Sequence, residues 1–430
     1  MTSPNVVEEF RRALVAGDAA ATRALLTQHA DVRAAINAPV GDFGGRPVTV
    51  ARKNLPLLDV LLEFGADINL KSDWWAGPFG VLEYDITPDE AAPLIARGAV
   101  VDIFAAAHLG MAARVRELVD ADPALVHARG GDGKTPLHCA STVEIAEYLL
   151  KRGAVVDARD VDHESTAAQY LVRSAPEVAR LLVARGAWVD IFLAVGLGDV
   201  ARVERCLRED PAALDHRTGL GLYRALHRPG GAIAPQRVDI YRWVFGHFLS
   251  AMDVARLLGR REALAQLHAR ATPAQRLLDA CAAADRGAAE AIVSATPGLV
   301  ATLSTDQQRL IADRAFANDT AAVSLMLDLG FDARVPGHER FEAIRWAAFL
   351  GNAAMVARLL RYDPPLNTPD PSFGGTILGN CLYGACHGWA AGTGDFVATV
   401  RLLLEAGEEV RPGYGPTGIA AIDALLDARR

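Results

Sequence analysis

The feature that most constrains the fold is a short unit that recurs along the chain, with Gly65 and Gly98 marking equivalent ends 33 residues apart. In its clearest copy, Thr135 and Pro136 predict the start of a short helix, because threonine caps helix N-termini and proline fits the first helical position. A second helix follows, and its apolar residues share one face: Val143, Ile145, Ala146, Leu149 and Leu150. Such a helix pair can bury its apolar face only against a neighbour, so the pattern predicts a stack of similar units.

Residues 133–140 read Gly-Lys-Thr-Pro-Leu-His-Cys-Ala, and residues 149–154 read Leu-Leu-Lys-Arg-Gly-Ala. Together they closely resemble the ankyrin repeat, whose signature is G-x-T-P-L-H-x-A before a helix ending in L-L-x-x-G-A-x-V. The resemblance implies stacked antiparallel helix pairs with β-hairpin loops projecting at right angles. It also implies that Thr135, Pro136, Leu137 and His138 are structural, with the threonine and histidine hydrogen-bonded within the turn. Glycine enters the left-handed C-terminal position of a helix at little cost, which predicts helix ends at Gly65, Gly98, Gly153 and Gly186.

We therefore expect an all-α fold: one elongated ankyrin-repeat solenoid of about twelve helix-turn-helix units over residues 1–430. The expected subdivision is an N-terminal capping repeat (1–35), regular repeats (36–219), degenerate or elaborated repeats (220–270), repeats with a Gly-rich insertion near 384–394 (271–411) and a C-terminal cap (412–430).

Two junctions predict that some units lack the projecting hairpin. Residues 98–104 and 186–192 run from a helix end directly into the next apolar helix, 88 residues apart. Asp122-Pro123 and Asp210-Pro211 keep the same offset, and Leu137-His138 and Leu226-His227 are 89 residues apart. The chain is thus predicted to repeat in groups of about three units, each omitting one hairpin.

Charge and composition exclude several classes of protein. The net charge of −8, well mixed along the chain, argues against a general nucleic-acid binder, which needs a basic face. The sequence holds no apolar run long enough to span a membrane and does not begin like a signal peptide, so we expect a cytoplasmic protein without a membrane partner. The five cysteines, an odd number mostly within apolar helical patterns, predict reduced thiols.

Two aromatic segments are candidate binding residues. The first is a loop with Asp73, Trp74, Trp75 and Phe79, where the aromatic side chains either cover an apolar edge or anchor a partner as interface hot spots. The second carries Tyr241, Trp243, Phe245 and His247 at helical spacing. These side chains either face the core or, because the region is an insertion, line a pocket.

Two polar clusters also allow more than one interpretation. Asp160, Asp162, His163 and Glu164 fall where a hairpin tip is expected, which favours a solvated acidic turn over a contact point for a partner. Their spacing is not that of a calcium loop. Cys381, Cys386 and His387 are close in sequence, but the second ligand pair of a structural zinc site is absent. We therefore expect packed thiols there and no metal.

The sequence contains no phosphate-binding loop, nucleophile elbow or HExxH pair, so no catalytic residue and no cofactor are predicted. The leading hypothesis is a non-catalytic scaffold that binds a protein partner through its concave helix face and loop tips, anchored at 73–79 and 160–164. The anionic chain favours a partner with basic patches.

The alternative is a small-molecule-binding protein or enzyme with an aromatic pocket inside the solenoid. Its basis is the irregularity of the chain, with missing hairpins and insertions at 228–240 and 384–394. A deep cavity lined by Trp74, Trp75, Trp243 or His247 would favour this alternative, and a shallow open groove would favour the scaffold.

Overall fold

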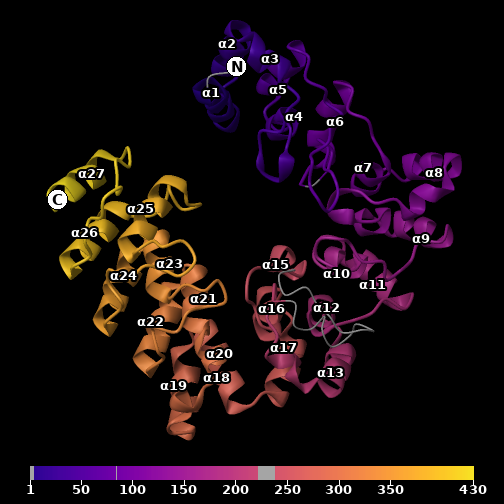
Figure 1. Ribbon diagram of the computed structural model, residues 1–430. Helices are drawn as coiled ribbons and strands as arrows, with labels where there is room; N and C mark the ends of the chain where they lie inside the picture. Colours follow the sequence, from indigo (N-terminus) through magenta and orange to yellow (C-terminus); the bar gives the residue numbers. More distant parts are fainter. Residues whose placement is uncertain (1–3, 84, 221–237) are drawn as a thin grey trace. The chain divides into compact units, whose positions relative to one another are not determined.

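The computed structural model describes residues 4–83, 85–220 and 238–430, and over these residues the secondary structure is α-helices and short 3-10 turns (η), with no strand (Figure 1). A single isolated antiparallel bridge, between Arg159 and Thr166, is all that the described residues retain of a hairpin ladder. The predicted all-α class is confirmed. The expected helix end at Leu226 to Gly231, and most of the insertion at 228–240, lie outside the described residues.

Contacts between residues divide the chain into two units. Unit 1 comprises residues 1–202 and 218–246, and unit 2 comprises residues 203–217 and 247–430. In the described part of either unit, no helix is both long and apolar enough to cross a bilayer.

The helices of unit 1 follow the chain in pairs. They are α1 (Pro4–Val15), α2 (Ala19–Gln28), α3 (Ala30–Ala34), η1 (Asp42–Gly44), α4 (Pro47–Ala51), α5 (Leu55–Glu63), α6 (Pro88–Ala96), α7 (Ile103–His108), α8 (Ala112–Ala121), η2 (Pro123–His127), η3 (Gly131–Gly133), η4 (Pro136–Cys139), α9 (Val143–Lys151), α10 (Ala167–Leu171), α11 (Pro176–Ala184), α12 (Ile191–Leu197) and α15 (Tyr241–Val244). Helix α13 (Val200–Glu209) begins in unit 1 and ends in unit 2.

Unit 2 continues the same arrangement. Its elements are η5 (Pro211–Leu214), α16 (Ala251–Leu257), α17 (Arg261–Arg270), α18 (Pro273–Ala282), α19 (Arg286–Ala295), η6 (Leu299–Thr302), α20 (Thr305–Gln308), α21 (Leu310–Phe316), α22 (Thr320–Leu329), α23 (Ala343–Phe349), α24 (Ala353–Leu359), η7 (Leu360–Tyr362), α25 (Ile377–His387), α26 (Phe396–Ala406) and α27 (Ala420–Asp427). One row of helices packs α21 on α23 and α23 on α25, and a second row packs α22 on α24 and α24 on α26 (Figure 1).

Local sequence signals account for the helix boundaries. The Thr87 backbone N–H donates to the Glu90 carboxylate (2.9 Å) and the Glu90 N–H donates to the Thr87 hydroxyl (3.3 Å), which forms a capping box at the start of α6. The predicted helix ends at Gly65, Gly98, Gly153 and Gly186 are confirmed, since all four glycines have φ between 92° and 99°. The segment after Thr135, expected as a short helix, is the 3-10 turn η4.

The structure also confirms the missing hairpins. Fifteen residues separate α9 from α10, whereas six separate α6 from α7 and α11 from α12. At both short junctions an aspartate caps the following helix: Asp102 accepts the N–H groups of Phe104 and Ala105, and Asp190 accepts that of Leu193. An immediate N-cap thus takes the place of a projecting loop.

Small residues allow the helices of unit 2 to approach closely. A Cβ atom on Gly384 would lie 2.0 Å from the carbonyl oxygen of Phe349, so α25 packs directly on the backbone of α23 at this point. Gly384 therefore lies inside α25. The predicted start of the Gly-rich insertion at Gly384 is wrong, because the helix continues for one more turn. The loop between α25 and α26 begins at Gly388.

Candidate functional site

A partly open groove of about 550 Å³ in unit 1 is the candidate functional site. Residues from segments 41–52 and 72–85 form one side, and residues from the 132–163 region and from the start of α15 form the rest. Its lining residues are Gly41, Phe43, Gly45, Thr49, Val50, Arg52, Ser72, Trp74, Phe79, Glu83, Asp85, Asp132, Asp162, His163, Ile240 and Trp243. The structure thus brings together residues from both aromatic segments and from the predicted acidic tip.

The aromatic wall of the groove is centred on Trp74. Its ring meets the Phe43 ring edge-on at 4.6 Å, and its indole N–H donates to the Asp132 carboxylate (3.1 Å). Trp74 is half-buried, but its neighbours Trp75 and Phe43 are 60% and 62% exposed. Both interpretations of this loop therefore apply, because Trp74 covers the edge of the repeat stack and Trp75 and Phe43 are exposed beside it. Asp73 pairs with Arg46 and is not part of the groove lining.

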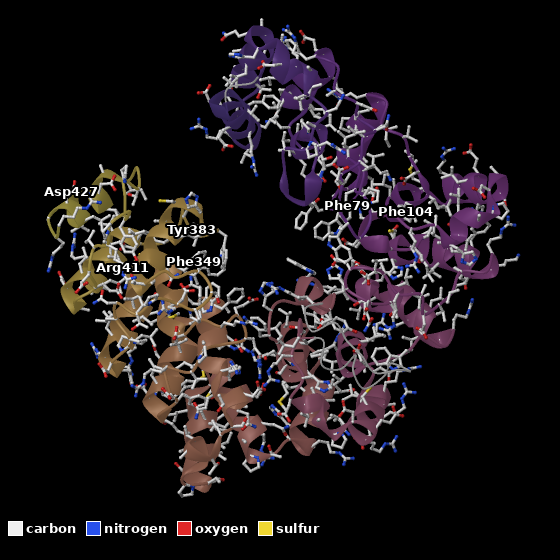
Figure 2. All side chains as sticks on the ribbon, viewed as in Figure 1. Phe79, Phe104, Phe349, Tyr383, Arg411 and Asp427 are labelled. Atoms are coloured by element: carbon white, nitrogen blue, oxygen red, sulfur yellow. The ribbon has the colours of Figure 1, made fainter. Side chains whose placement is uncertain are left out.

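Phe79, labelled in Figure 2, also lines the groove. A Cβ atom on Gly131 would lie 2.0 Å from its ring, so only glycine fits beside it. The Lys134 ammonium lies 5.6 Å from the ring centroid, within cation–π distance. A neighbouring glycine, Gly77, has φ of 145°, and a Cβ there would meet the Gly130 carbonyl oxygen at 2.1 Å. The loop is therefore held against the next repeat by close backbone packing.

Helix α15 presents one aromatic residue to the groove and buries the others. Tyr241 and Phe245 face the core, and the Tyr241 hydroxyl donates to the buried Asp190 carboxylate (3.0 Å). Trp243 is 65% exposed and lines the groove. His247 belongs to unit 2, where its ring stacks on Phe316 at 5.0 Å. His247 is not among the residues that line the groove, whereas Trp243 is.

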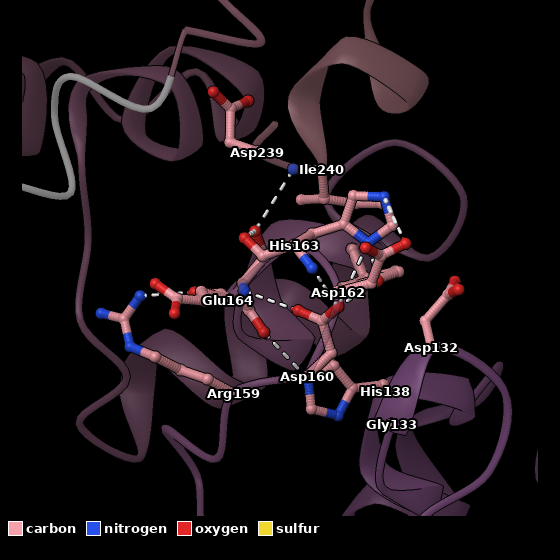
Figure 3. A network of polar contacts seen from close by, with 12 residues as sticks. Asp132, Gly133, His138, Arg159, Asp160, Asp162, His163, Glu164, Asp239 and Ile240 are labelled. Atoms are coloured by element: carbon pink, nitrogen blue, oxygen red, sulfur yellow. Dashed lines mark hydrogen bonds and ion pairs between the residues drawn. The ribbon is translucent and has the colours of Figure 1, made fainter. Parts of the chain in front are cut away.

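The predicted solvated acidic turn is also wrong for three of its four residues. Asp160, His163 and Glu164 are buried, and only Asp162 is half-buried. Asp160 accepts the backbone N–H groups of His163 (2.7 Å) and Ser165 (2.6 Å), so its carboxylate closes the turn from inside (Figure 3). Burial alone would raise the pKa of Asp160, but the hydrogen bonds from His163 and Ser165 outweigh it and the pKa lies below its usual value.

The motif histidine is structural, as predicted. The Thr135 N–H donates to His138 Nδ1 (3.1 Å), and Nε2 lies 3.1 Å from the Ser165 carbonyl oxygen. Nδ1 is therefore the acceptor and Nε2 the donor, which requires a neutral ring. Complete burial lowers the pKa of His138 to about 4, in agreement with this role.

One group of metal-ligating side chains was not anticipated from the sequence. Asp132, Asp162 and His163 each present a ligand atom within 4.8 Å of the others, and all three line the groove. Asp132 lies 30 residues before Asp162, on the turn of the preceding repeat. The repeat period was the signal that could have paired them, because equivalent turns of successive repeats lie side by side.

The cysteines do not form such a group in the described residues. All five are free thiols, and burial raises the pKa of Cys139 to about 11. Cys381 is buried within α25, as expected of a packed thiol. Cys386 is exposed, so the expectation of a packed thiol is wrong at that position.

Comparison with known proteins places the chain. Residues 103–192 match a family model described as ankyrin repeats (3 copies). A segment of 57 residues is 49% identical to the serine/threonine-protein kinase VIK of Arabidopsis thaliana, which is 13% of this chain and 13% of that kinase. The matched repeats span η4, α9 and the motif residues Thr135 to His138 described above. This match, together with the all-helical architecture of the described residues, supports ankyrin repeats in residues 103–192 of the chain.

Proposed function

We propose that this protein is a non-catalytic binding scaffold and that the groove of unit 1 receives a segment of a protein partner. Ankyrin repeats generally mediate protein–protein interactions, which supports the general class. The observation that carries the specific proposal is the exposure of two lining residues, Phe43 and Trp243, on a groove of about 550 Å³. Trp75 is also exposed, next to Trp74 in the chain, but does not line the groove. Exposed aromatic residues beside a concave surface are typical of interface hot spots.

The groove is suited to binding because contacts within the protein already fix the side chains of its walls. Trp74 is fixed by its hydrogen bond to Asp132 and by its contact with Phe43. Phe79 is fixed by its packing on Gly131. Ordering costs on binding are therefore small, and more of the contact energy contributes to affinity.

Charge in the lining favours a basic partner segment. The lining contains four carboxylates, Glu83, Asp85, Asp132 and Asp162, and one cationic side chain, Arg52. Arg52 pairs with Asp85, and Glu83 pairs with Lys71. Asp132 and Asp162 lie together at the end formed by the 132–163 region, where Asp132 also accepts the Trp74 indole N–H. A segment with an aromatic or aliphatic side chain next to lysine or arginine matches this arrangement.

Substitution of Trp243 tests the proposal. Peptides selected from a displayed library against the full chain should bind in the groove, and Trp243→Ala should weaken their binding by about 2 kcal/mol, roughly 30-fold. The measurement is fluorescence polarisation with labelled peptide. Trp389→Ala in unit 2 is the matched control, because Trp389 is exposed to the same degree (67%) but lies outside the groove, and it should leave the affinity unchanged.

Peptides that bind Trp243→Ala as tightly as the unchanged protein would contradict the proposed site. Loss of binding in both variants would point to a general effect of removing surface aromatic residues.

A second candidate function is binding of a small apolar molecule. The observation that favours it is the size of the groove, which lies within the range of about 300–1,000 Å³ typical of ligand sites. A thermal-shift screen of aromatic small molecules distinguishes the two functions. A compound that stabilises the protein and competes with no selected peptide, yet loses its effect in Trp243→Ala, would favour this second function.

A further inference from the structure

Three side chains at the acidic end of the groove have the composition of a metal site: one imidazole and two carboxylates. The Asp162 carboxylate lies 3.8 Å from His163 Nε2, and Asp132 completes a group whose ligand atoms all fall within 4.8 Å (Figure 3). Asp132 and His163 are buried and Asp162 is half-buried, so the group is not a set of solvated surface charges.

A fourth residue, outside this group, orients the histidine. His163 Nδ1 lies 3.2 Å from the Asp160 carboxylate and 3.0 Å from the Tyr170 hydroxyl, which itself donates to Asp160 (3.0 Å). Asp160 is ionised and can only accept, so Nδ1 carries the proton. In the neutral ring this leaves the lone pair on Nε2, the atom nearest Asp162. Metal-binding histidines are oriented by a carboxylate in this way.

The backbone holds the two contributing turns together. Val161 and Asp162 both donate their N–H groups to the Asp132 carbonyl oxygen (2.8 and 3.1 Å). A Cβ atom on Gly133 would lie 2.2 Å from the Val161 side chain, so the turns pack without a gap. The backbone positions of the two turns that carry the ligands are therefore fixed by contacts between them.

We propose that Asp132, Asp162 and His163 bind one divalent transition-metal ion, with further coordination positions facing the groove. A mixed set of imidazole and carboxylate ligands suits ions such as Zn²⁺, Co²⁺, Mn²⁺ or Fe²⁺. Ligands about 2.0–2.2 Å from a tetrahedral ion are roughly 3.4 Å apart, so the side chains close by about 1 Å on binding. Three protein ligands leave positions for water or for a donor group of a bound molecule. This inference does not depend on the proposed partner.

Cobalt titration tests the site. Tag-free full-length protein is titrated with CoCl₂, and the visible d–d absorption and its displacement by ZnCl₂ are measured. We expect one equivalent to bind saturably. Asp162→Asn and Asp132→Asn should each weaken binding by more than the roughly 10–100-fold typical of loss of an orienting residue. Both replacements keep the side-chain shape, and asparagine tolerates the left-handed backbone of Asp132 (φ 59°).

His338→Gln in unit 2 is the matched control. His338 also lies between two aspartates, with Nδ1 2.7 Å from Asp313 and Nε2 3.5 Å from Asp306, but no third ligand joins it among the described residues. Its replacement should leave cobalt binding unchanged.

Absence of saturable binding would overturn the proposal, as would full binding by Asp162→Asn or an equal loss in His338→Gln. Should Asp132→Asn fail to fold, Asp162→Asn still decides, because its half-buried side chain caps no helix. Trp243 is not a ligand, so Trp243→Ala should bind cobalt normally even if peptide binding is lost.

Discussion

The aromatic surfaces of the two units lie on different parts of the repeat, on loops in unit 1 and on helix faces in unit 2. In unit 1 the exposed aromatic residues lie on loops and on α15, around an acidic groove. In unit 2 the exposed Tyr383 and Trp389 lie on or beside helix α25. They cover a cluster of buried and half-buried rings on α21 and α23, where Phe316 meets Trp346 at 4.7 Å and Phe349 meets Trp389 at 4.8 Å. Phe349 and Tyr383 stack nearly parallel at 6.3 Å (Figure 2).

This difference shows which features of a repeat can vary without loss of the stack. Helix pairs supply the buried core in both units. In unit 1 the loops between them diverge and form a site, whereas in unit 2 the helix faces themselves carry the aromatic side chains. Both surfaces depend on glycines that permit close backbone approach, Gly77 in unit 1 and Gly384 in unit 2.

Substitution of those two glycines should have the largest effect on the free energy of unfolding. Gly77→Ala and Gly384→Ala should each lower the free energy of unfolding by about 4 kcal/mol or more, because the new methyl group would lie 2.1 or 2.0 Å from a backbone carbonyl oxygen. Peptide-resolved hydrogen exchange should place the loss in unit 1 for Gly77→Ala and in unit 2 for Gly384→Ala.

Gly65→Ala is the control for this pair. Gly65 has φ of 92° but no atom within 4 Å of the added methyl group, so only the left-handed backbone is penalised, by about 1–2 kcal/mol. A loss for Gly77→Ala no larger than that for Gly65→Ala would show that conformation, rather than close packing, explains Gly77. Gly384 has no positive φ, so a small loss for Gly384→Ala would contradict its close packing.

The next largest effect concerns Arg345, which is 2% exposed on α23 of unit 2. Its guanidinium donates to the Glu342 carboxylate (2.7 Å), to the Gly375 and Thr368 carbonyl oxygens, and to Asn380. Arg345→Met should cost about 3 kcal/mol, because these acceptors would lose a buried partner. Denaturant unfolding measures the loss. Arg358→Met, on the partly exposed pair with Asp328, should cost less than about 1 kcal/mol.

Two buried aspartates, one in each unit, should contribute to stability with opposite dependence on pH. In unit 1, burial raises the pKa of Asp190 to about 6, despite hydrogen bonds from Leu193, Gln169 and Tyr241. The folded state then holds this proton more tightly than the unfolded chain, so the contribution to stability is full below about pH 4. It is lost as pH rises through 6, by about 3 kcal/mol.

In unit 2, burial also acts to raise the pKa of Asp253, but the Arg314 guanidinium at 2.9 Å and the bonds from Ser250 outweigh it. Its pKa lies below the usual value, so its contribution is present above about pH 4 and is lost under more acidic conditions.

The buried His138 of unit 1 acts in the opposite direction to Asp190, because its pKa of about 4 makes the folded state less stable at acidic pH. The test is therefore a comparison with Asp190→Asn, which cannot ionise. By hydrogen exchange corrected for intrinsic rates, the stability of unit 1 in the unchanged protein relative to Asp190→Asn should fall by about 2 kcal/mol between pH 4.5 and 7. An unchanged difference between the two proteins would contradict this assignment to Asp190.

Much of the fold was predictable because its signals are local. Thr87, Pro88 and Glu90 specify a helix start through bonds within one turn, and Gly65 and Gly153 specify helix ends through backbone conformation alone. The short junctions before Ile103 and Ile191 were predictable for the same reason, since Asp102 and Asp190 cap the helices that follow them.

The groove was only partly predictable. Trp74, Phe79, Asp162, His163 and Trp243 were singled out by residue type, but nothing in their spacing showed that one surface contains them all. Asp160 and His163 appeared solvated because a hairpin tip usually projects into water. Their burial arises from the packing of the neighbouring turn at Asp132 and of Ile240, whose N–H donates to Ser165.

By itself, the sequence determined the helical repeat, its boundaries and the junctions without hairpins, because capping and periodicity act over a few residues. The tertiary structure alone decided which distant residues share a surface: Asp132 lies beside Asp162, and Trp243 lines the same groove as Trp74. Those contacts depend on how successive repeats stack and where one unit gives way to the next, and neither is encoded within a single repeat.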